Sequence, residues 1–257
     1  MTTNQILLDL RGRKALVTGG SRGIGAATVK LLAKAGADVV IGYHVRADDA
    51  NAVVEEAKSS GVHAAAIAAD VATQTGADTL VRTAADQLGG LNLFVCNAGI
   101  WPAEDIPLTE MDDEHWHRTL RENLDSVFFT ARAAARLMAD GGSMVLVSST
   151  AGQRGEAYHA DYAATKGAVI SFAKSLAVEL APRDINVNCV APGWVDTDMV
   201  RTAIAETGFV RIVSGIPIGR IASPDDVAGP IVFLCSSLAR HITGEVLNIN
   251  GGSVLCG

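Results

Sequence analysis

The chain has 257 residues, of which 49% are apolar and 19% charged, and its 28 acidic residues outnumber its 21 basic residues, giving a net charge of −7. This composition excludes an intrinsically disordered chain, which combines low hydrophobicity with high net charge. The acid excess disfavours nucleic acids and anionic membranes as partners. We therefore expect a folded protein with no nucleic-acid or membrane partner.

The four cysteines, Cys96, Cys189, Cys235 and Cys256, form no C-x-x-C pair and have no regular spacing. Because a chain of this size buries enough core to fold without disulfides, we expect reduced thiols and a cytoplasmic protein. The order of charged and apolar residues at the N-terminus does not match a secretory signal. No apolar run approaches the roughly 18 residues of a membrane span.

Apolar stretches of strand length alternate with stretches of helical periodicity along the chain. The predicted strands lie near Ala15–Thr18, Val39–Gly42, Ala64–Ala68, Leu91–Cys96, Met144–Ser149, Ile185–Val190 and Val246–Ile249. The predicted helices include Ile24–Ala35, Asp49–Ser59, Gly76–Leu88, Asp112–Ala139, Tyr162–Leu180 and Asp225–Leu238. Because the strands are apolar almost throughout, they should be buried on both faces. The sequence thus predicts one α/β domain over residues 1–257, with about seven parallel strands, helices on both faces and ligands at the carboxyl edge.

A glycine-rich segment, Thr18 to Gly25, follows the first predicted strand and opens the first predicted helix. Its glycines are spaced G-x-x-x-G-x-G, which differs from the general dinucleotide fingerprint. Glycines at such a turn let the backbone approach a pyrophosphate, and the helix N-terminus offers N–H groups and a partial positive charge. We expect a dinucleotide-phosphate site made by Gly19, Ser21, Arg22, Gly23, Ile24 and Gly25.

The end of the second predicted strand bears on the choice of dinucleotide. NAD-binding proteins usually carry an acidic residue there for the ribose hydroxyls, but the segment Gly42–His44 has none. Arg22, His44 and Arg46 would instead surround a 2′-phosphate with cations. NADP(H) is therefore the preferred cofactor and NAD(H) the alternative. Arg46 could instead be a solvated surface charge, so Arg22 is the stronger candidate.

The segment Gly19-x-Ser21-x-Gly23 also matches the nucleophile elbow of an α/β-hydrolase, with Asp225 and His241 later in the required order. In that fold several strands precede the elbow. Only 18 residues precede Gly19, which disfavours the hydrolase.

Tyr162 and Lys166 are four residues apart on a predicted helix, so a phenol and an ammonium lie one turn apart on the same face. A nearby cation stabilises a phenolate and lowers the pKa of a tyrosine. Ser149, 13 residues before Tyr162, ends the fifth predicted strand and could meet the phenol at the carboxyl edge. Ser148 is the alternative, because only one of two adjacent strand residues can face the site.

Two asparagines complete this group of polar residues. Asn97-Ala98-Gly99 ends the fourth predicted strand, where small residues leave room for a nucleotide. Asn123 could hold a water that links Lys166 to solvent, or it could bond only to its own helix backbone.

The chain resembles the short-chain dehydrogenase/reductase family over nearly its whole length. The motifs that carry the resemblance are Thr18 to Gly25, Asp70-Val71, Asn97 to Gly99, Asn123, Ser149, Tyr162 with Lys166, Pro192-Gly193 with Thr197, and Asn250-Gly251-Gly252. The resemblance implies a single-domain, doubly wound Rossmann fold and an NAD(P)-dependent oxidoreductase.

The resemblance also implies roles for particular residues. Tyr162 would donate a proton to the carbonyl oxygen that Ser149 polarises, Lys166 would hold the nicotinamide ribose, and Asn123 would support a proton-relay water. Asp70 with Val71 would lie beside the adenine, Asn97 near its ribose, and Val195 and Thr197, after Pro192 and Gly193, near the carboxamide. A catalytically silent dinucleotide sensor is the non-enzyme alternative.

The substrate region is predicted around residues 193–217, which in this family cap the substrate. Trp194, Met199, Phe209 and Ile212 could form an apolar lid, with Trp101, Gln153 and His159 on loops around the same mouth, although ordinary packing would give the same pattern. The chain is most similar to the 3-oxoacyl-[acyl-carrier-protein] reductase group, which suggests a 3-oxoacyl thioester or similar ketone reduced with NADPH. An acidic acyl carrier protein would call for cations at the mouth; Arg183 could supply one, whereas Asp140 is unfavourable. A small-molecule ketone, sugar or alcohol is therefore the alternative substrate.

Neither a metal site nor a monomer is expected. His115 and His117 are two residues apart on a predicted helix and point to different faces. In the family, helices equivalent to the two long predicted ones pack across two-fold axes, and so we expect a homotetramer.

Overall fold

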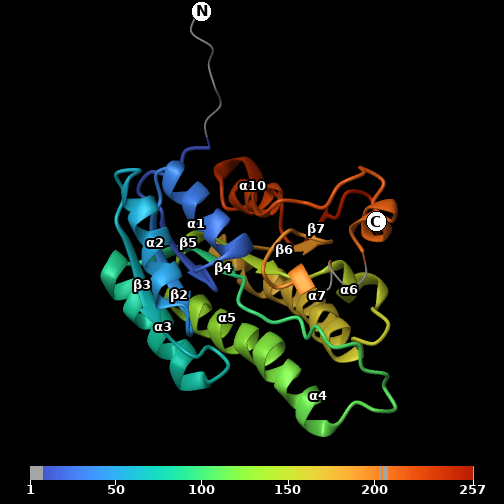
Figure 1. The fold of residues 1–257 in the computed structure, drawn as a ribbon. Helices are drawn as coiled ribbons and strands as arrows, with labels where there is room; N and C mark the ends of the chain where they lie inside the picture. The colour runs from blue at the N-terminus through green and yellow to red at the C-terminus, as the bar shows by residue number, and fades with distance from the viewer. Residues whose placement is uncertain (1–7, 203, 205–207, 257) are drawn as a thin grey trace, which may run out of the picture.

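The computed structural model describes residues 8–202, 204 and 208–256. A parallel sheet of seven strands, ordered β3-β2-β1-β4-β5-β6-β7, forms the centre of the molecule (Figure 1). The strands are β1 (Lys14–Thr18), β2 (Asp38–Tyr43), β3 (Ala64–Ala68), β4 (Leu91–Cys96), β5 (Met138–Val147), β6 (Asn186–Pro192) and β7 (Val246–Ile249). The predicted fold class, a doubly wound α/β domain, is confirmed.

Helices cover both faces of the sheet, above and below it in the view of Figure 1. One face carries α1 (Gly23–Lys34), α2 (Ala47–Lys58) and α10 (Pro224–Leu234). The opposite face carries α3 (Gln74–Leu88), α5 (Ser126–Leu137) and α7 (Ala160–Leu180). The shorter helices are α4 (Asp113–Leu120), α6 (Thr150–Arg154) and α9 (Phe209–Ser214), and 3₁₀ turns occupy Ala181–Arg183 and Ser237–Ala239. Each face therefore has its own apolar core.

The single helix predicted over Asp112–Ala139 is interrupted. A π-helical segment, Arg121–Asp125, separates α4 from α5, and the chain has entered β5 at Met138. Asn123, at the centre of this segment, is fully buried and hydrogen-bonds the backbone of Ile100. A π-helical turn of this kind is frequent at functional sites, and this one carries a side chain bonded to a segment 23 residues earlier.

The fifth strand also differs from its predicted bounds, Met144–Ser149. It starts at Met138 and ends at Val147, because Ser149 is the N-cap of α6 and its Oγ accepts a hydrogen bond from the backbone N–H of Ala151 at 3.1 Å. Ser149 thus lies just beyond the strand.

The strand order reverses direction between β1 and β4. The chain runs outward through β2 and β3 on one side of β1, and then returns to build β4 to β7 on the other side. In sheets of this kind ligands bind outside the carboxyl ends of the strands at the reversal point. A cavity lined by residues of the β1–α1 turn and of the segment after β4 opens at this place.

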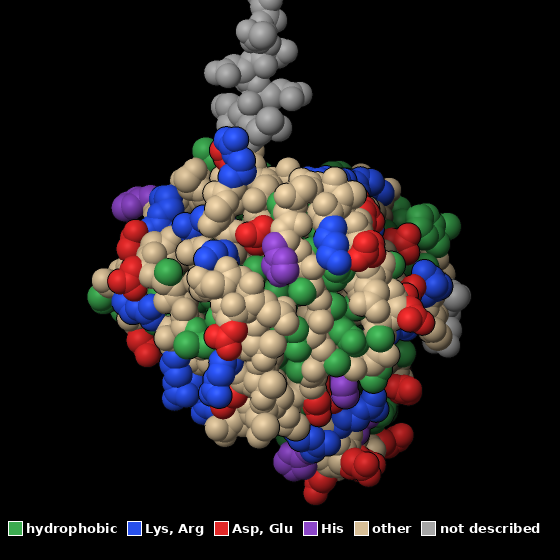
Figure 2. All heavy atoms as spheres, turned by 90° about the vertical axis from the view of Figure 1, so that its left-hand side faces the viewer, with side chains coloured by type: hydrophobic (Ala, Val, Ile, Leu, Met, Phe, Trp, Pro, Cys, Tyr) green, Lys and Arg blue, Asp and Glu red, His purple; other side chains and the backbone are tan. Residues whose placement is uncertain are grey.

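Within the described residues, no helix has both the length and the apolarity to cross a membrane. In the same part of the chain, no group of three or more His, Cys, Asp and Glu side chains is arranged to hold a metal ion. Figure 2 shows basic side chains intermixed with acidic ones on the face that it presents.

Candidate active site

The glycine turn joins β1 to α1 and forms one end of the cavity. Gly19 and Gly23 have φ values of +66° and +54°, in the region that favours glycine. A methyl group at Gly25 would lie 2.2 Å from the carbonyl oxygen of Gly19, so only glycine fits. The side chain of Arg22, at the N-cap, does not cap α1, and the first turn has no acidic residue. The helix N-terminus can therefore donate N–H groups to a phosphate.

Asn97, at the end of β4, holds the glycine turn in place. Its Nδ2 donates to the carbonyl oxygens of Thr18 and Gly19, each at 3.1 Å. In return, the backbone N–H groups of Asn97 and Ala98 donate to Thr18 Oγ1 at 3.0 and 3.1 Å. Four hydrogen bonds donated by Asn97 and Ala98 thereby join the carboxyl ends of β1 and β4.

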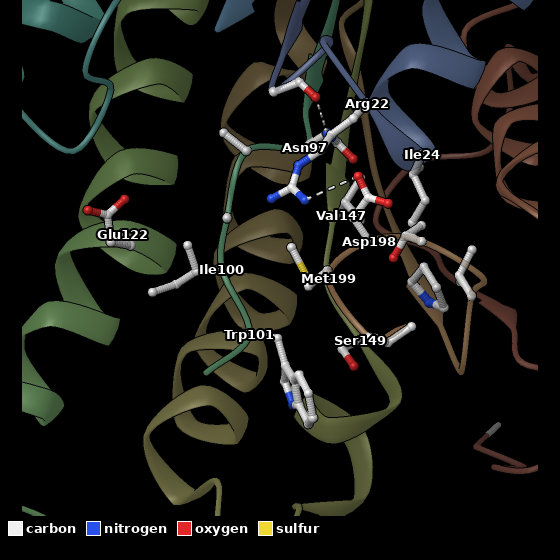
Figure 3. Close-up of a pocket in the computed structure, with 18 of the residues that line it drawn as sticks. Arg22, Ile24, Asn97, Ile100, Trp101, Glu122, Val147, Ser149, Asp198 and Met199 are labelled. Atoms are coloured by element: carbon white, nitrogen blue, oxygen red, sulfur yellow. Dashed lines mark hydrogen bonds and ion pairs between the residues drawn. The ribbon is translucent and has the colours of Figure 1, made fainter. Parts of the chain in front are cut away.

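The expected cations line the nucleotide end of the cavity together with Asp70 and Val71. Arg22 and Arg46 are both half-exposed, but they are not free charges. Arg46 Nη1 lies 3.1 Å from Asp49 Oδ2, and Asp198 Oδ2 lies 3.8 Å from Arg22 Nη1 and 4.0 Å from Arg46 Nη1. Figure 3 shows Arg22 and Asp198 pointing toward each other in the cavity.

Tyr162, Lys166 and Ser149 come together at the other end of the cavity, and all three line it. Tyr162 and Lys166 are buried side chains of α7, and Lys166 Nζ lies 5.7 Å from the centre of the phenol ring. Lys166 Nζ also donates to the carbonyl oxygen of Val147 at 3.1 Å. Ser148 Oγ donates to the Lys166 carbonyl oxygen at 2.7 Å, which leaves Ser149 as the hydroxyl beside Tyr162.

The protonation of this group differs from the sequence-based expectation. Burial raises the pKa of Tyr162 above its ordinary value, a hydrogen bond with Ser149 acts in the opposite direction, and the charge of Glu156 raises the pKa further. Burial also lowers the pKa of Lys166, while the thiols of Cys96 and Cys189 act against that shift. In the chain on its own, burial therefore outweighs the expected acidifying effect of Lys166 on the phenol.

Asn123 does not line the cavity. Its Oδ1 accepts from the backbone N–H of Ile100 at 2.8 Å, and its Nδ2 donates to the Ile100 carbonyl oxygen at 2.9 Å. A methyl group at Gly99 would lie 2.7 Å from Asn123 Oδ1 and 3.5 Å from Lys166 Nζ. Asn123 thus bonds neither to its own helix nor directly to Lys166, and it fixes the loop that carries Trp101.

A close crossing of α6 and α7 brings Ser149 and Lys166 to the same wall. Gly152 in α6 faces the backbone of Lys166 and Gly167, and a methyl group there would lie 2.4 Å from the Lys166 carbonyl carbon. The missing side chain lets the two helix backbones touch directly.

The substrate end contains a group of aromatic side chains. The Trp101 ring stacks on His159 with centroids 4.7 Å apart, and Trp194 meets Trp101 edge-on at 6.2 Å. Trp101 and Trp194 line the cavity as expected, but His159 is buried behind Trp101 and Gln153 donates to Asn248 Oδ1 at 2.6 Å. His159 and Gln153 therefore support the wall without forming it.

Most of the residues expected to bind the cofactor line this one cavity. They are Gly19, Ser21, Arg22, Gly23, Ile24, His44, Arg46, Asp70, Val71, Asn97, Ala98, Gly99, Tyr162, Lys166, Pro192, Gly193, Val195 and Thr197. Gly25 lies behind the glycine turn. The lid expected over 193–217 is divided: Met199 lines the cavity, Ile212 is buried elsewhere, and Phe209 is exposed. Residues 203 and 205–207 of that segment lie outside the described part of the chain.

Sequence reasoning missed several lining residues, among them Ile100, Glu122, Arg154, Glu156 and Asp198. Arg154 and Glu156 stand between Ser149 and Tyr162, so their position between two candidate residues was the available signal. Asp198 follows Thr197 directly, but only the folded chain places it beside Arg22.

The structure also decides two points that the sequence left open, the role of Arg183 and the hydrolase alternative. Arg183 does not serve the cavity: it precedes β6 at the amino edge of the sheet, where its guanidinium bonds Asp140 and the carbonyl oxygens of Ala135 and Met138. The hydrolase arrangement is also absent, since Ser21 lines the cavity without Asp225 or His241.

The sequence and the fold match known proteins over almost the entire chain. The family model described as Enoyl-(Acyl carrier protein) reductase matches residues 19–253. A 3-oxoacyl-[acyl-carrier-protein] reductase of Synechocystis is 40% identical over 96% of this chain and 98% of its own. An L-rhamnose 1-dehydrogenase (NAD(P)(+)) of Azotobacter vinelandii is 38% identical over 96% of this chain and 97% of its own.

A solved structure extends the similarity to three dimensions. A short-chain dehydrogenase from Burkholderia cenocepacia, crystallised in complex with NADP, has a TM-score of 0.89 at 40% identity, covering 95% of this chain and 98% of that one. Together with the seven-stranded parallel sheet and the Tyr162-x-x-x-Lys166 pair, these matches establish that the chain is an oxidoreductase of the short-chain dehydrogenase/reductase family.

Proposed function

We propose that the protein transfers a hydride between NADP(H) and a carbonyl or alcohol substrate, with Tyr162 as the group that gives or takes the proton. The observation that carries this proposal is the convergence of Tyr162, Ser149 and Lys166 on one wall of a cavity whose far end is the glycine turn. The fit is chemical as well as spatial, because N–H donors and two arginines lie at the phosphate end and a buried phenol lies at the reacting end.

NADP(H) fits this chain better than NAD(H), which stays the alternative. The residues proposed to hold it are those of the glycine turn, Arg22, His44 and Arg46 at the phosphates, and Val195 and Thr197 at the nicotinamide end. The complex of the Burkholderia relative with NADP supports this choice. When bound, the cofactor supplies or accepts the hydride.

The side chains of this chain supply the proton and the orientation. Tyr162 donates its phenolic proton to the carbonyl oxygen of the substrate, and Ser149, which lines the same wall of the cavity, polarises the same oxygen. Lys166, buried beside the phenol, favours the phenolate left behind. Asn123 positions the loop before Trp101. General acid catalysis of this kind contributes about 10²–10⁴-fold to a rate.

Two substrate classes are proposed. The first is a 3-oxoacyl thioester or similar ketone, supported by the similarity to the Synechocystis reductase, with an acyl carrier protein as its carrier. The second is a small uncharged ketone, sugar or alcohol. A specific observation favours the second. Glu156 lines the substrate end, and Glu104 and Asp105 are exposed on the loop after Trp101. Among the described residues, these three carboxylates outnumber the one exposed cation of that end, Arg154, so an acidic carrier would meet a net negative mouth.

A substrate panel tests the proposal. Oxidation of NADPH and of NADH is followed in parallel with a short 3-oxoacyl thioester, small ketones and aldoses in both directions. We expect Tyr162→Phe to abolish turnover and to leave the dissociation constant of NADPH within about threefold of the wild type. Tyr158→Phe is the matched control, because Tyr158 is exposed and outside the cavity. Equal loss of binding and turnover in Tyr162→Phe, or turnover that persists, would contradict the assigned role.

We also propose a homotetramer and a cytoplasmic location. Phe128 on α5 and Val178 on α7 are exposed apolar side chains. The guanidinium of Arg132 lies 4.7 Å above the Phe128 ring. Within the described residues, its Nε and Nη2 atoms are buried and have no hydrogen-bond partner. A second subunit packed over Phe128 would cover that ring and supply partners for the Arg132 guanidinium. Light scattering tests the assembly, and a monomer would overturn it. The four free cysteines support a reducing compartment.

A further inference from the structure

The carboxylate of Asp198 divides its two oxygens between different partners. Oδ1 lies 2.7 Å from Arg201 Nη2, three residues further along the chain. Oδ2 faces the nucleotide end of the cavity, 3.8 Å from Arg22 Nη1 and 4.0 Å from Arg46 Nη1 (Figure 3). One anion of the chain thus stands between the two arginines that the 2′-phosphate would need.

Each of the two arginines already has an acidic partner at this position. Arg46 also lies 3.1 Å from Asp49, so two guanidinium groups face two carboxylates. All four side chains are between 38% and 49% exposed, so water screens each pair. The 2′-phosphate therefore has to compete for cations that are already partnered.

We propose that Asp198 competes with the 2′-phosphate of NADP(H) for Arg22 and Arg46 and so reduces the preference of this protein for NADP(H) over NAD(H). This inference rests on the proposed function, since it concerns the same cofactor site. The distances favour competition over support: at 3.8 and 4.0 Å Asp198 makes no hydrogen bond that would orient either guanidinium, whereas a phosphate can form charge-assisted bonds to both.

The pair with Arg201 explains how Asp198 can give way. Because Oδ1 is held by Arg201, loss of the contacts at Oδ2 does not leave the carboxylate without a cation. Met199 and Val200, which follow directly, line the same cavity. A bound 2′-phosphate would therefore remove the link between the glycine turn and this part of the substrate wall.

The test measures binding, without turnover. The probes are 2′,5′-ADP, which carries the 2′-phosphate without a nicotinamide, and 5′-AMP, which lacks the 2′-phosphate. Both are titrated calorimetrically at low ionic strength. NADPH and NADH are titrated in parallel. We expect Asp198→Asn to tighten binding of 2′,5′-ADP and NADPH about twofold to tenfold, the range for losing two exposed ion pairs. Binding of 5′-AMP and NADH should stay within about twofold.

Asp196→Asn is the matched control: it removes the same charge from the same segment, but Asp196 is exposed, outside the cavity and not paired with Arg22 or Arg46 among the described residues. It should leave all four affinities unchanged. In an Arg22→Ala background the gain from Asp198→Asn should shrink.

Three results would overturn the proposal: weaker or unchanged binding of 2′,5′-ADP by Asp198→Asn, equal tightening of 5′-AMP, or the same gain in Asp196→Asn. A wild-type chain that binds NADH and NADPH but shows no turnover would refute the proposed function and leave this inference standing. A chain that binds neither would refute both.

Discussion

Gly152 offers a direct test of how the active site is held together. A methyl group at this position would lie 2.4 Å from the carbonyl carbon of Lys166 and 2.6 Å from the backbone nitrogen of Gly167. Both obstacles are backbone atoms of α7, so no side-chain rotation can relieve the overlap. Gly152→Ala must therefore push α6 and α7 apart.

The size of the displacement follows from the distances. Ordinary van der Waals contact for such a carbon begins at 3.4 Å, so the helices must separate by 3.4 minus 2.4, or about 1.0 Å. Overpacking of this kind costs about 1–3 kcal/mol of unfolding free energy. A shift of about 1 Å between Lys166 and Ser149 is also enough to reduce kcat/KM by about 10²-fold.

Urea unfolding and steady-state kinetics measure the two effects separately. Gly167→Ala is the graded comparison, because it adds the same methyl group at the same helix crossing but would lie 3.2 Å from the Gly152 carbonyl oxygen. It should show a smaller loss of both quantities. If Gly152→Ala keeps kcat/KM within about threefold of the wild type, or if Gly167→Ala is the more damaging variant, the reasoning fails.

Three further outcomes are expected. Because the charge of Glu156 raises the pKa of Tyr162, Glu156→Gln should move the pH profile of alcohol oxidation, which requires the phenolate, to lower pH at constant ionic strength; an unchanged profile or an alkaline shift contradicts this. Asn123→Ala leaves both backbone groups of Ile100 unpaired and should lower the unfolding free energy in urea by about 2–4 kcal/mol, and a loss below 1 kcal/mol would argue against it. Asp226 completes the capping box of α10, and its hydrogen bond with Arg220 holds the pKa of its carboxyl below the ordinary value. The ionised carboxylate therefore stabilises the folded chain at pH values above the unfolded-state pKa of an aspartate. Asp226→Asn should lower the melting temperature at pH 7 by a few degrees, and the difference from the wild type should shrink in strong acid.

The sheet and the glycine turn could be predicted from the sequence because their signals are local. The burial of apolar strands bounded by glycine or asparagine, such as Leu91–Cys96, can be predicted from the composition of the strand alone. The G-x-x-x-G-x-G spacing after β1 and the four-residue separation of Tyr162 and Lys166 depend only on helix and turn geometry.

The features that sequence reasoning missed depend on contacts between distant segments. Nothing in the residues around Asn123 indicates a hydrogen bond to Ile100, 23 positions earlier. Asn123 also lies in the π-helical segment that interrupts the helix, although the apolar pattern of this region favours one continuous helix. The contact between Asp198 and Arg22 likewise joins positions far apart in the chain. The pKa of Tyr162 follows from burial, which spacing alone cannot measure.

The bonds from Asn97 to the end of β1 have a thermodynamic consequence. Since Thr18 and Gly19 are already fixed by these bonds, the backbone that would meet the pyrophosphate has little conformational freedom left to lose. Association of an adenine dinucleotide should then carry a small ordering cost at this end of the cleft. Asn97→Ala would transfer that cost to the binding step, so its penalty should appear as a more unfavourable entropy of association and a slower on-rate.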